Sequence, residues 1–186
     1  MDGRGLLALV EEVERKLAAR GDVFHVHEIE FGRPLPEAAL ANIEADLGIQ
    51  LPEPLRSFYV DVGRFLVFRW SVRRGQGEQL GCVGETPEGR LELEPVERLR
   101  QAWTPERRRD VPRVLRVTSD GYGDGYALAF DGARAPRVVW YTHDGAPKDA
   151  VVACHPSVEA WLTAWARVGF ALGRATTALE RFLAKP

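Results

Sequence analysis

The chain has little cysteine and no cysteine pattern. Only Cys82 and Cys154 occur among its 186 residues, each inside an apolar stretch and neither in a C-x-x-C pair. Structural zinc sites take four closely arranged ligands, and disulfide-stabilised domains contain several paired cysteines. The two cysteines therefore favour small buried side chains in a protein of the reducing cytoplasm.

Long hydrophobic runs are also missing. No eighteen consecutive apolar residues occur, which argues against a membrane-spanning helix. The first residues, MDGRGLLALVEEVERKL, contain a short apolar run, but charge returns at Glu11 and no cleavage pattern of small residues follows. We therefore expect no export signal, no membrane association and a cytoplasmic location.

The chain has no excess of either charge. Its 25 basic and 27 acidic residues give a formal net charge of −2, which is not the electrostatic footprint of a nucleic-acid-binding protein. The densest basic cluster is residues 107–109 with Arg113 and Arg116. Glu106 and Asp110 bracket it, and no aromatic residues alternate with the arginines to stack on bases. A solvated charged turn is the simpler interpretation.

The chain does contain enough apolar residues to form one domain with a hydrophobic core. Hydrophobic residues make up 45% of the sequence and charged residues 28%. Helical spacing and short β-branched or aromatic runs follow one another without long crossovers, which predicts an α+β fold with a predominantly antiparallel sheet flanked by helices. The expected helices cover residues 4–19, 40–47, 53–62 and 96–103, one begins near Pro156, and another begins at residue 169. The expected strands cover residues 23–31, 65–72, 80–83, 90–93, 114–117, 126–130, 137–142 and 151–153.

The most informative segment is ALANIEADLGIQLPEPLRSFY, residues 40–59. Leu40, Ile43 and Leu47 fall at helical spacing, and Gly48 stands where a glycine can close a helix in the left-handed conformation. An Ile-x-Leu-Pro step follows, and then a second helix whose apolar residues are spaced i, i+3, i+4 and i+7. The segment therefore predicts two helices joined by a short extended step.

This helix pair resembles the N-terminal signature of the SUKH superfamily, which includes Smi/Knr-type fungal cell-wall regulators and bacterial immunity proteins. The segments VLRVTSDGYGDGYALAFD, VVWYTHDG and SVEAWLTAW resemble, in order, the strand–turn–strand, strand and terminal-helix parts of the same superfamily. The family's usual Asn-Gly-Gly-like turn after the second helix is replaced by Val62-Gly63-Arg64. The resemblance divides the chain into an N-terminal helical extension packed on the domain (1–33), a SUKH-like domain (34–168) and a C-terminal helix (169–186).

The resemblance implies a non-catalytic protein-binding domain. The main expectation is an immunity protein that occludes the active site of a toxin, and the alternative is a regulatory adaptor or scaffold. Expected partners are therefore proteins, most of all a toxin, with no nucleic acid and no membrane; the oligomeric state is left open.

Three groups of residues compete with this interpretation. Asp120, Asp124 and Asp131 lie among glycines, but the loop lacks the bidentate glutamate of an EF-hand, and a tight turn needs the same residues. His25 and His27 would share one face of a strand without the spacing of further metal ligands. We therefore expect no metal and no cofactor.

A general acid–base pair is the third candidate. His143 and Asp144 lie beside Tyr141, with Asp120 or Asp124 on a neighbouring turn, but no activated nucleophile accompanies them, because Ser119 is not in a G-x-S-x-G elbow. We expect no enzyme, and keep a small metal-dependent hydrolase as the least favoured alternative.

Partner binding directs attention to arginine and tryptophan, which often anchor protein interfaces. The strand FLVFRWSVRRG would offer such anchors if one of its faces is open, and the Gly-Asp turn could add polar contacts. The predicted partner-binding residues are Arg69, Trp70, Arg73, Arg74, Asp120, Tyr122, Asp124 and His143.

Overall fold

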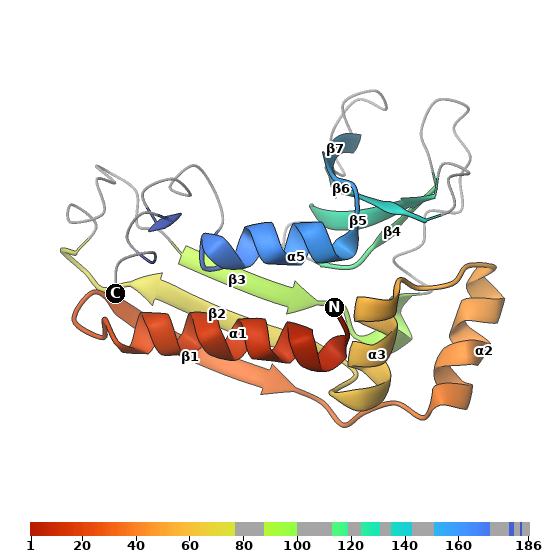
Figure 1. Cartoon of the computed structure of the whole chain (residues 1–186), viewed down its shortest axis with the longest axis horizontal. Coiled ribbons are helices and arrows are strands. Elements are labelled where there is room, and N and C mark those ends of the chain that lie inside the picture. The colour runs from red at the N-terminus through yellow and green to blue at the C-terminus, as the bar shows by residue number, and fades with distance from the viewer. Residues whose placement is uncertain are drawn as a thin grey trace.

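The structure is a computed structural model that combines helices with two antiparallel sheets (Figure 1). It describes residues 1–76, 88–99, 113–118, 124–130, 135–142, 151–171, 179–180 and 183. The expected α+β class is confirmed. The strand expected at 80–83 lies outside the described residues, and a 3-10 turn at Val96–Arg98 begins the short helix expected at 96–103.

The first sheet has the order β1-β2-β3, with β1 at Phe24–Phe31, β2 at Leu66–Val72 and β3 at Glu88–Leu93. All pairs are antiparallel, and a β-bulge interrupts the register of β1 between Val26 and Glu28. Helix α1, Gly3–Ala18, buries its apolar stripe and packs along β1, as its i, i+4 and i+7 spacing predicts. Residues 1–33 therefore supply an edge strand as well as a helix.

The second sheet has the order β4-β5-β6-β7 and consists of successive antiparallel neighbours. It lies at the end of the molecule where α5, Val158–Arg167, begins (Figure 1). An isolated bridge between Leu93 and Thr118 connects the two sheets. The strands are β4 at Arg113–Arg116, β5 at Gly125–Phe130, β6 at Arg137–Tyr141 and β7 at Val151–His155.

Helices α2, Glu37–Leu47, and α3, Glu53–Asp61, form the predicted pair. Gly48 ends α2 with φ 64°, and the Ile49 N–H donates to the Glu44 carbonyl, the hydrogen bond of a Schellman motif. The buried Glu44 side chain then accepts the Leu51 N–H at 2.8 Å. This bond satisfies a backbone donor in the extended step, where no regular element supplies an acceptor.

The C-terminal part of the chain agrees with the expectation at the start of α5 and differs from it at residue 169. Helix α5 begins at Val158, near the expected Pro156, and Ser157 caps it, because its hydroxyl accepts the Ala160 N–H at 3.1 Å. The helix expected from residue 169 does not begin there, because Gly169 and Phe170 have φ of 65° and 58° and Ala171 pairs with Gly89 of β3. Farther along, Leu179, Glu180 and Leu183 are helical. The left-handed residues turn the chain out of α5 and lay it against the sheet.

One large core joins α1, the helix pair, the inner face of the first sheet and α5, and a smaller cluster lies within the second sheet. Trp161 and Trp165 stack on α5, and Trp70 meets Phe24 edge to face with ring centroids 5.3 Å apart. No helix in the described ranges is long and apolar enough to cross a membrane.

Candidate functional site

The two faces of the first sheet differ sharply in chemistry. Alternation along β2 buries Leu66, Phe68, Trp70 and Val72 on the inner face, against the helices. No described helix packs on the opposite face, which we call the outer face. The side chains of the outer face are His25, His27, Glu28 and Glu30 on β1, Val67, Arg69 and Ser71 on β2, and Glu88, Arg90 and Glu92 on β3.

Arg69 lies on the central strand of the outer face, and its side chain is 44% exposed. Its Nε donates to Glu92 Oε1 at 2.6 Å on one neighbouring strand, and its Nη1 lies 3.5 Å from Glu28 Oε2 on the other. Arg90 adds a second cation to Glu92, with its Nη2 2.6 Å from Oε2. The four side chains form a charged network across three strands, which holds the guanidinium in a fixed orientation.

The two arginines also set the titration of the carboxylate between them. Partial burial acts to raise the pKa of Glu92, but hydrogen bonds from Arg90 and Arg69 outweigh it and hold the pKa below its ordinary value of 4.5. Glu92 is therefore a fixed negative charge on the outer face, beside the central Arg69.

The histidine pair occupies the other end of the outer face. The His25 and His27 rings meet edge to face with centroids 4.5 Å apart, and His27 Nε2 lies 2.7 Å from Ser71 Oγ. Both rings project to one side because the two residues are two apart on the strand. Within the described part of the chain, no three His, Cys, Asp or Glu side chains come together as metal ligands.

Trp70 is not available as a surface anchor. It is 1% exposed, and its indole Nε1 donates to the Gly169 carbonyl, so it belongs to the core. Arg73 and Arg74 are exposed just after β2, and Arg73 Nε donates to the Gly21 carbonyl at 2.6 Å. Of the four residues predicted on this segment, Arg69, Arg73 and Arg74 therefore lie at the surface.

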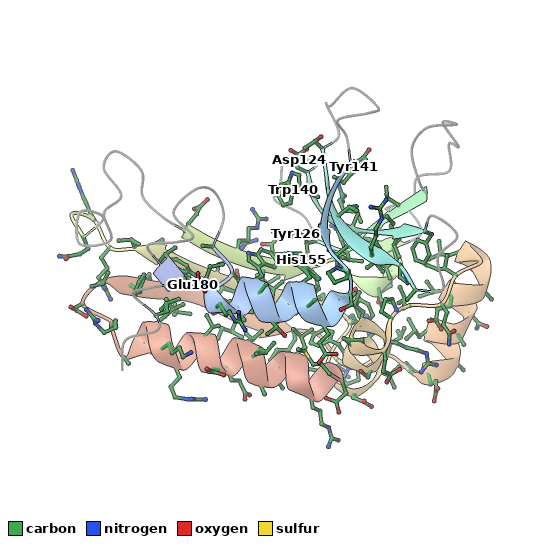
Figure 2. The ribbon with its side chains drawn as sticks, turned by 45° about the horizontal axis from the view of Figure 1, so that its top comes forward. Asp124, Tyr126, Trp140, Tyr141, His155 and Glu180 are labelled. Carbon is green, nitrogen blue, oxygen red and sulfur yellow. The ribbon has the colours of Figure 1, made fainter. Side chains whose placement is uncertain are left out.

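The remaining predicted residues belong to the second sheet. Asp120, Tyr122 and His143 lie outside the described residues, and Asp124 is half-buried at the start of β5. Figure 2 places Asp124 near Tyr141 and Trp140, away from the first sheet. The structure therefore assigns Arg69 and Asp124 to different sheets and does not join them in one site.

The half-buried tryptophan of the described strands is Trp140 rather than Trp70. The rings of Trp140 on β6 and Tyr126 on β5 meet edge to face with centroids 5.0 Å apart (Figure 2). The Tyr126 ring also contacts the rings of Trp161 and Trp165 on α5. The strand RVVWYT was recognised from the sequence, but nothing in its spacing shows which face packs against α5.

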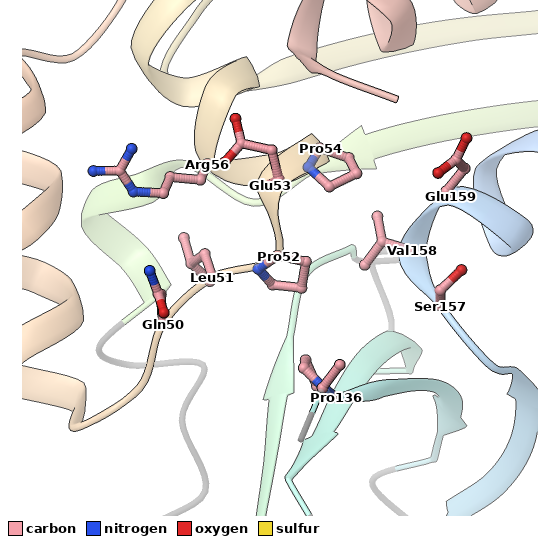
Figure 3. A pocket seen from close by; sticks show the side chains of 11 residues that line it. Gln50, Leu51, Pro52, Glu53, Pro54, Arg56, Pro136, Ser157, Val158 and Glu159 are labelled. Atoms are coloured by element: carbon pink, nitrogen blue, oxygen red, sulfur yellow. The ribbon is translucent and has the colours of Figure 1, made fainter. Parts of the chain in front are cut away.

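A groove of about 390 Å³ opens where the helix pair meets the second sheet and α5 (Figure 3). Its lining comes from three distant segments and is rich in proline, with carboxylates on α3 and α5. The lining residues are Gln50, Leu51, Pro52, Glu53, Pro54, Arg56, Ala135, Pro136, Ser157, Val158 and Glu159.

Charged groups at the groove are largely paired within the protein. Arg56 Nη2 lies 2.8 Å from Glu37 Oε1 and its Nε lies 3.5 Å from Glu44 Oε2; chiefly the hydrogen bond to Glu37 raises the pKa of the guanidinium. Glu159 lies 3.1 Å from the Met1 ammonium group. The Ser157 hydroxyl is engaged in capping α5. This arrangement suits binding, because it presents fixed charges rather than a group poised for proton transfer.

Comparison with known proteins gives one match. A family model described as the SMI1 / KNR4 family (SUKH-1) matches residues 34–164. No curated protein and no solved structure matches the chain. The matched region contains the helix pair, β2, the whole lining of the groove and most of α5, whereas α1 and β1 precede it.

Proposed function

The chain belongs to the SMI1 / KNR4 family (SUKH-1), and from that premise we propose that it is an immunity protein that neutralises a toxin by binding it. Membership of this family supports a non-catalytic immunity or regulatory domain that acts through protein–protein interaction. Toxin neutralisation and a cytoplasmic site of action are the specific parts of the proposal.

The observation that supports a binding surface is the position of Arg69. It lies at the centre of a sheet face that no described helix covers, and carboxylates on both neighbouring strands fix its guanidinium. A side chain held in one rotamer loses less conformational entropy on binding than a free one. Arg73 and Arg74 extend the positive charge beyond the end of β2.

The proposed mechanism is occlusion. The outer face covers the active site of the toxin, and its alternating charges, from Glu28 through Arg69 to Glu92, pair with complementary charges on the toxin. Complementary charge at an interface sets specificity and speeds association more than it adds affinity. The protein then needs no catalytic group of its own.

The test begins with affinity capture from the native host's lysate, using the full chain, and identification of bound proteins by mass spectrometry. The expected result is one stoichiometric partner that is toxic when expressed alone and harmless when expressed with this chain. Arg69→Glu should abolish the rescue, because it reverses the central charge of the outer face. Arg4→Glu, an exposed reversal on α1, is the matched control and should preserve it.

The possible outcomes test the immunity function and the proposed binding surface separately. Rescue by the Arg69→Glu variant would leave the immunity function standing and reject the outer face as its surface. Several weaker partners with no toxicity would favour the regulatory adaptor instead. Absence of any rescued toxin would reject the immunity function itself.

A further inference from the structure

Strand β1 forms one edge of the first sheet. It pairs with β2 on one side, and no described residue pairs with it on the other. An unpaired edge strand presents a row of backbone donors and acceptors that can accept another strand. Near its end lies Phe31, the exposed large hydrophobic side chain of the described residues, at 43% exposure.

The sequence of β1, FHVHEIEF, is complementary to itself. When the strand is laid antiparallel against a copy about its midpoint, each residue meets a chemically matching one. Aromatic meets aromatic, aliphatic meets aliphatic, and histidine meets glutamate. The four kinds of pair are Phe24 with Phe31, His25 with Glu30, Val26 with Ile29, and His27 with Glu28.

The bulge makes this register sterically sensible. In a strand with strict alternation, residues related by the midpoint of an eight-residue strand would lie on opposite faces. The extra residue between Val26 and Glu28 places His27 and Glu28 on the same, outer face. The apolar pairs therefore share the inner face, and both histidine–glutamate pairs share the outer face.

We propose that two copies of this chain associate through β1 to form a two-fold symmetric dimer with a continuous six-stranded sheet. A two-fold axis at the midpoint of the strand makes every contact twice, so a self-complementary strand suits a second copy better than an unrelated strand. The pairing covers Phe31 and joins the outer faces of both copies side by side. Four His–Glu contacts across the axis fix the register.

His25 and Glu30 offer the sharpest test of the pairing. Neither has an ion pair among the described residues, whereas Glu28 is already engaged with Arg69. Sedimentation of the full chain over a range of concentrations should show a species of about twice the 20.8 kDa chain mass. His25→Glu should weaken this dimer about tenfold, because it places carboxylates opposite each other at two symmetric positions.

A second substitution provides the rescue. Adding Glu30→Lys to His25→Glu restores opposite charges at both positions and should return the dimer affinity to near its original value. Glu88→Lys, on the other edge of the same sheet, is the matched control and should leave affinity unchanged. Far-UV circular dichroism checks that each variant is folded.

Two results would overturn the proposal. One is a monomer at every concentration, which would leave the edge to a strand from another protein. The other is a dimer whose affinity does not respond to His25→Glu, which would locate the interface elsewhere. Protection of β1 amides that rises with concentration, measured by hydrogen exchange, would support the strand as the interface.

Discussion

Arg69 and Trp70 are neighbours on β2, yet they belong to opposite regions of the molecule. Trp70 faces the helices, is 1% exposed and donates its indole hydrogen to the Gly169 carbonyl. Arg69 faces outward, is 44% exposed and joins carboxylates on two neighbouring strands. The inner face of the sheet is held by packing, and the outer face by charge.

This difference predicts that substitutions on the two faces have unequal effects on stability. Removing inner-face residues leaves cavities in a core that also involves α1 and α5. Exposed ion pairs contribute little to folding, because solvent screens them and ordering the side chains costs entropy. The charges of the outer face can therefore change without a large cost in stability.

The largest effect is expected on the inner face. Trp70→Ala should lower the free energy of unfolding by about 3–5 kcal/mol, because it removes a buried aromatic ring and leaves the Gly169 carbonyl without its donor. Arg69→Ala, one residue earlier, should change it by less than about 1 kcal/mol. Urea unfolding followed by circular dichroism measures both. Equal losses for the two variants would contradict the division between faces.

A second prediction compares a buried and an exposed carboxylate in the helix pair. Arg56 contacts both, the buried Glu44 and the exposed Glu37. Glu44→Ala should lower the free energy of unfolding by about 1–3 kcal/mol, because it leaves the Leu51 N–H without an acceptor. Glu37, whose side chain is 68% exposed, is the matched control, and Glu37→Ala should cost less than about 1 kcal/mol. Urea unfolding again gives both values, and a Glu37→Ala loss as large as that of Glu44→Ala would show that the Arg56 ion pairs dominate.

The smallest effect concerns acid on the outer face. The folded-state pKa of Glu92 lies below its ordinary value, so its ion pairs stabilise the fold above about pH 4.5, and this contribution is lost as the pH falls through the folded-state pKa. Glu92→Gln should therefore flatten the decline in melting temperature below pH 4.5, with Glu88→Gln on the same strand as control. An unchanged acid profile would show that the network around Arg69 does not form in solution.

Much of the fold could be predicted from local patterns. The i, i+3, i+4 spacing located α1, α2 and α3, Gly48 marked the end of α2, and β-branched runs located β2 and β6. The boundary was misplaced after α5: the helix expected from residue 169 does not begin there, although Leu179, Glu180 and Leu183 farther along are helical. A left-handed turn and pairing of Ala171 with Gly89 prevailed at residue 169, because tertiary contacts outweigh a weak helical preference.

The candidate surface was only half predictable. Arg69 does lie on the uncovered side of the sheet, and its role in binding stays a prediction. Trp70 was assigned to the wrong environment, because period-two alternation separates the two faces of a strand but does not say which one the helices cover. The groove could not be foreseen, since its lining comes from residues 50–56, 135–136 and 157–159.

The amino-acid sequence by itself determined where the helices and strands form, how the helix pair is joined and that neighbouring strands pair antiparallel, because spacing, turn residues and short connections act locally. It also determined the self-complementary pattern of β1, which is a property of eight consecutive residues. Only the tertiary structure decided which face of the first sheet is covered, which carboxylates meet Arg69 and Arg56, and where the groove opens. Those outcomes depend on contacts between segments far apart in the chain, which local patterns do not encode.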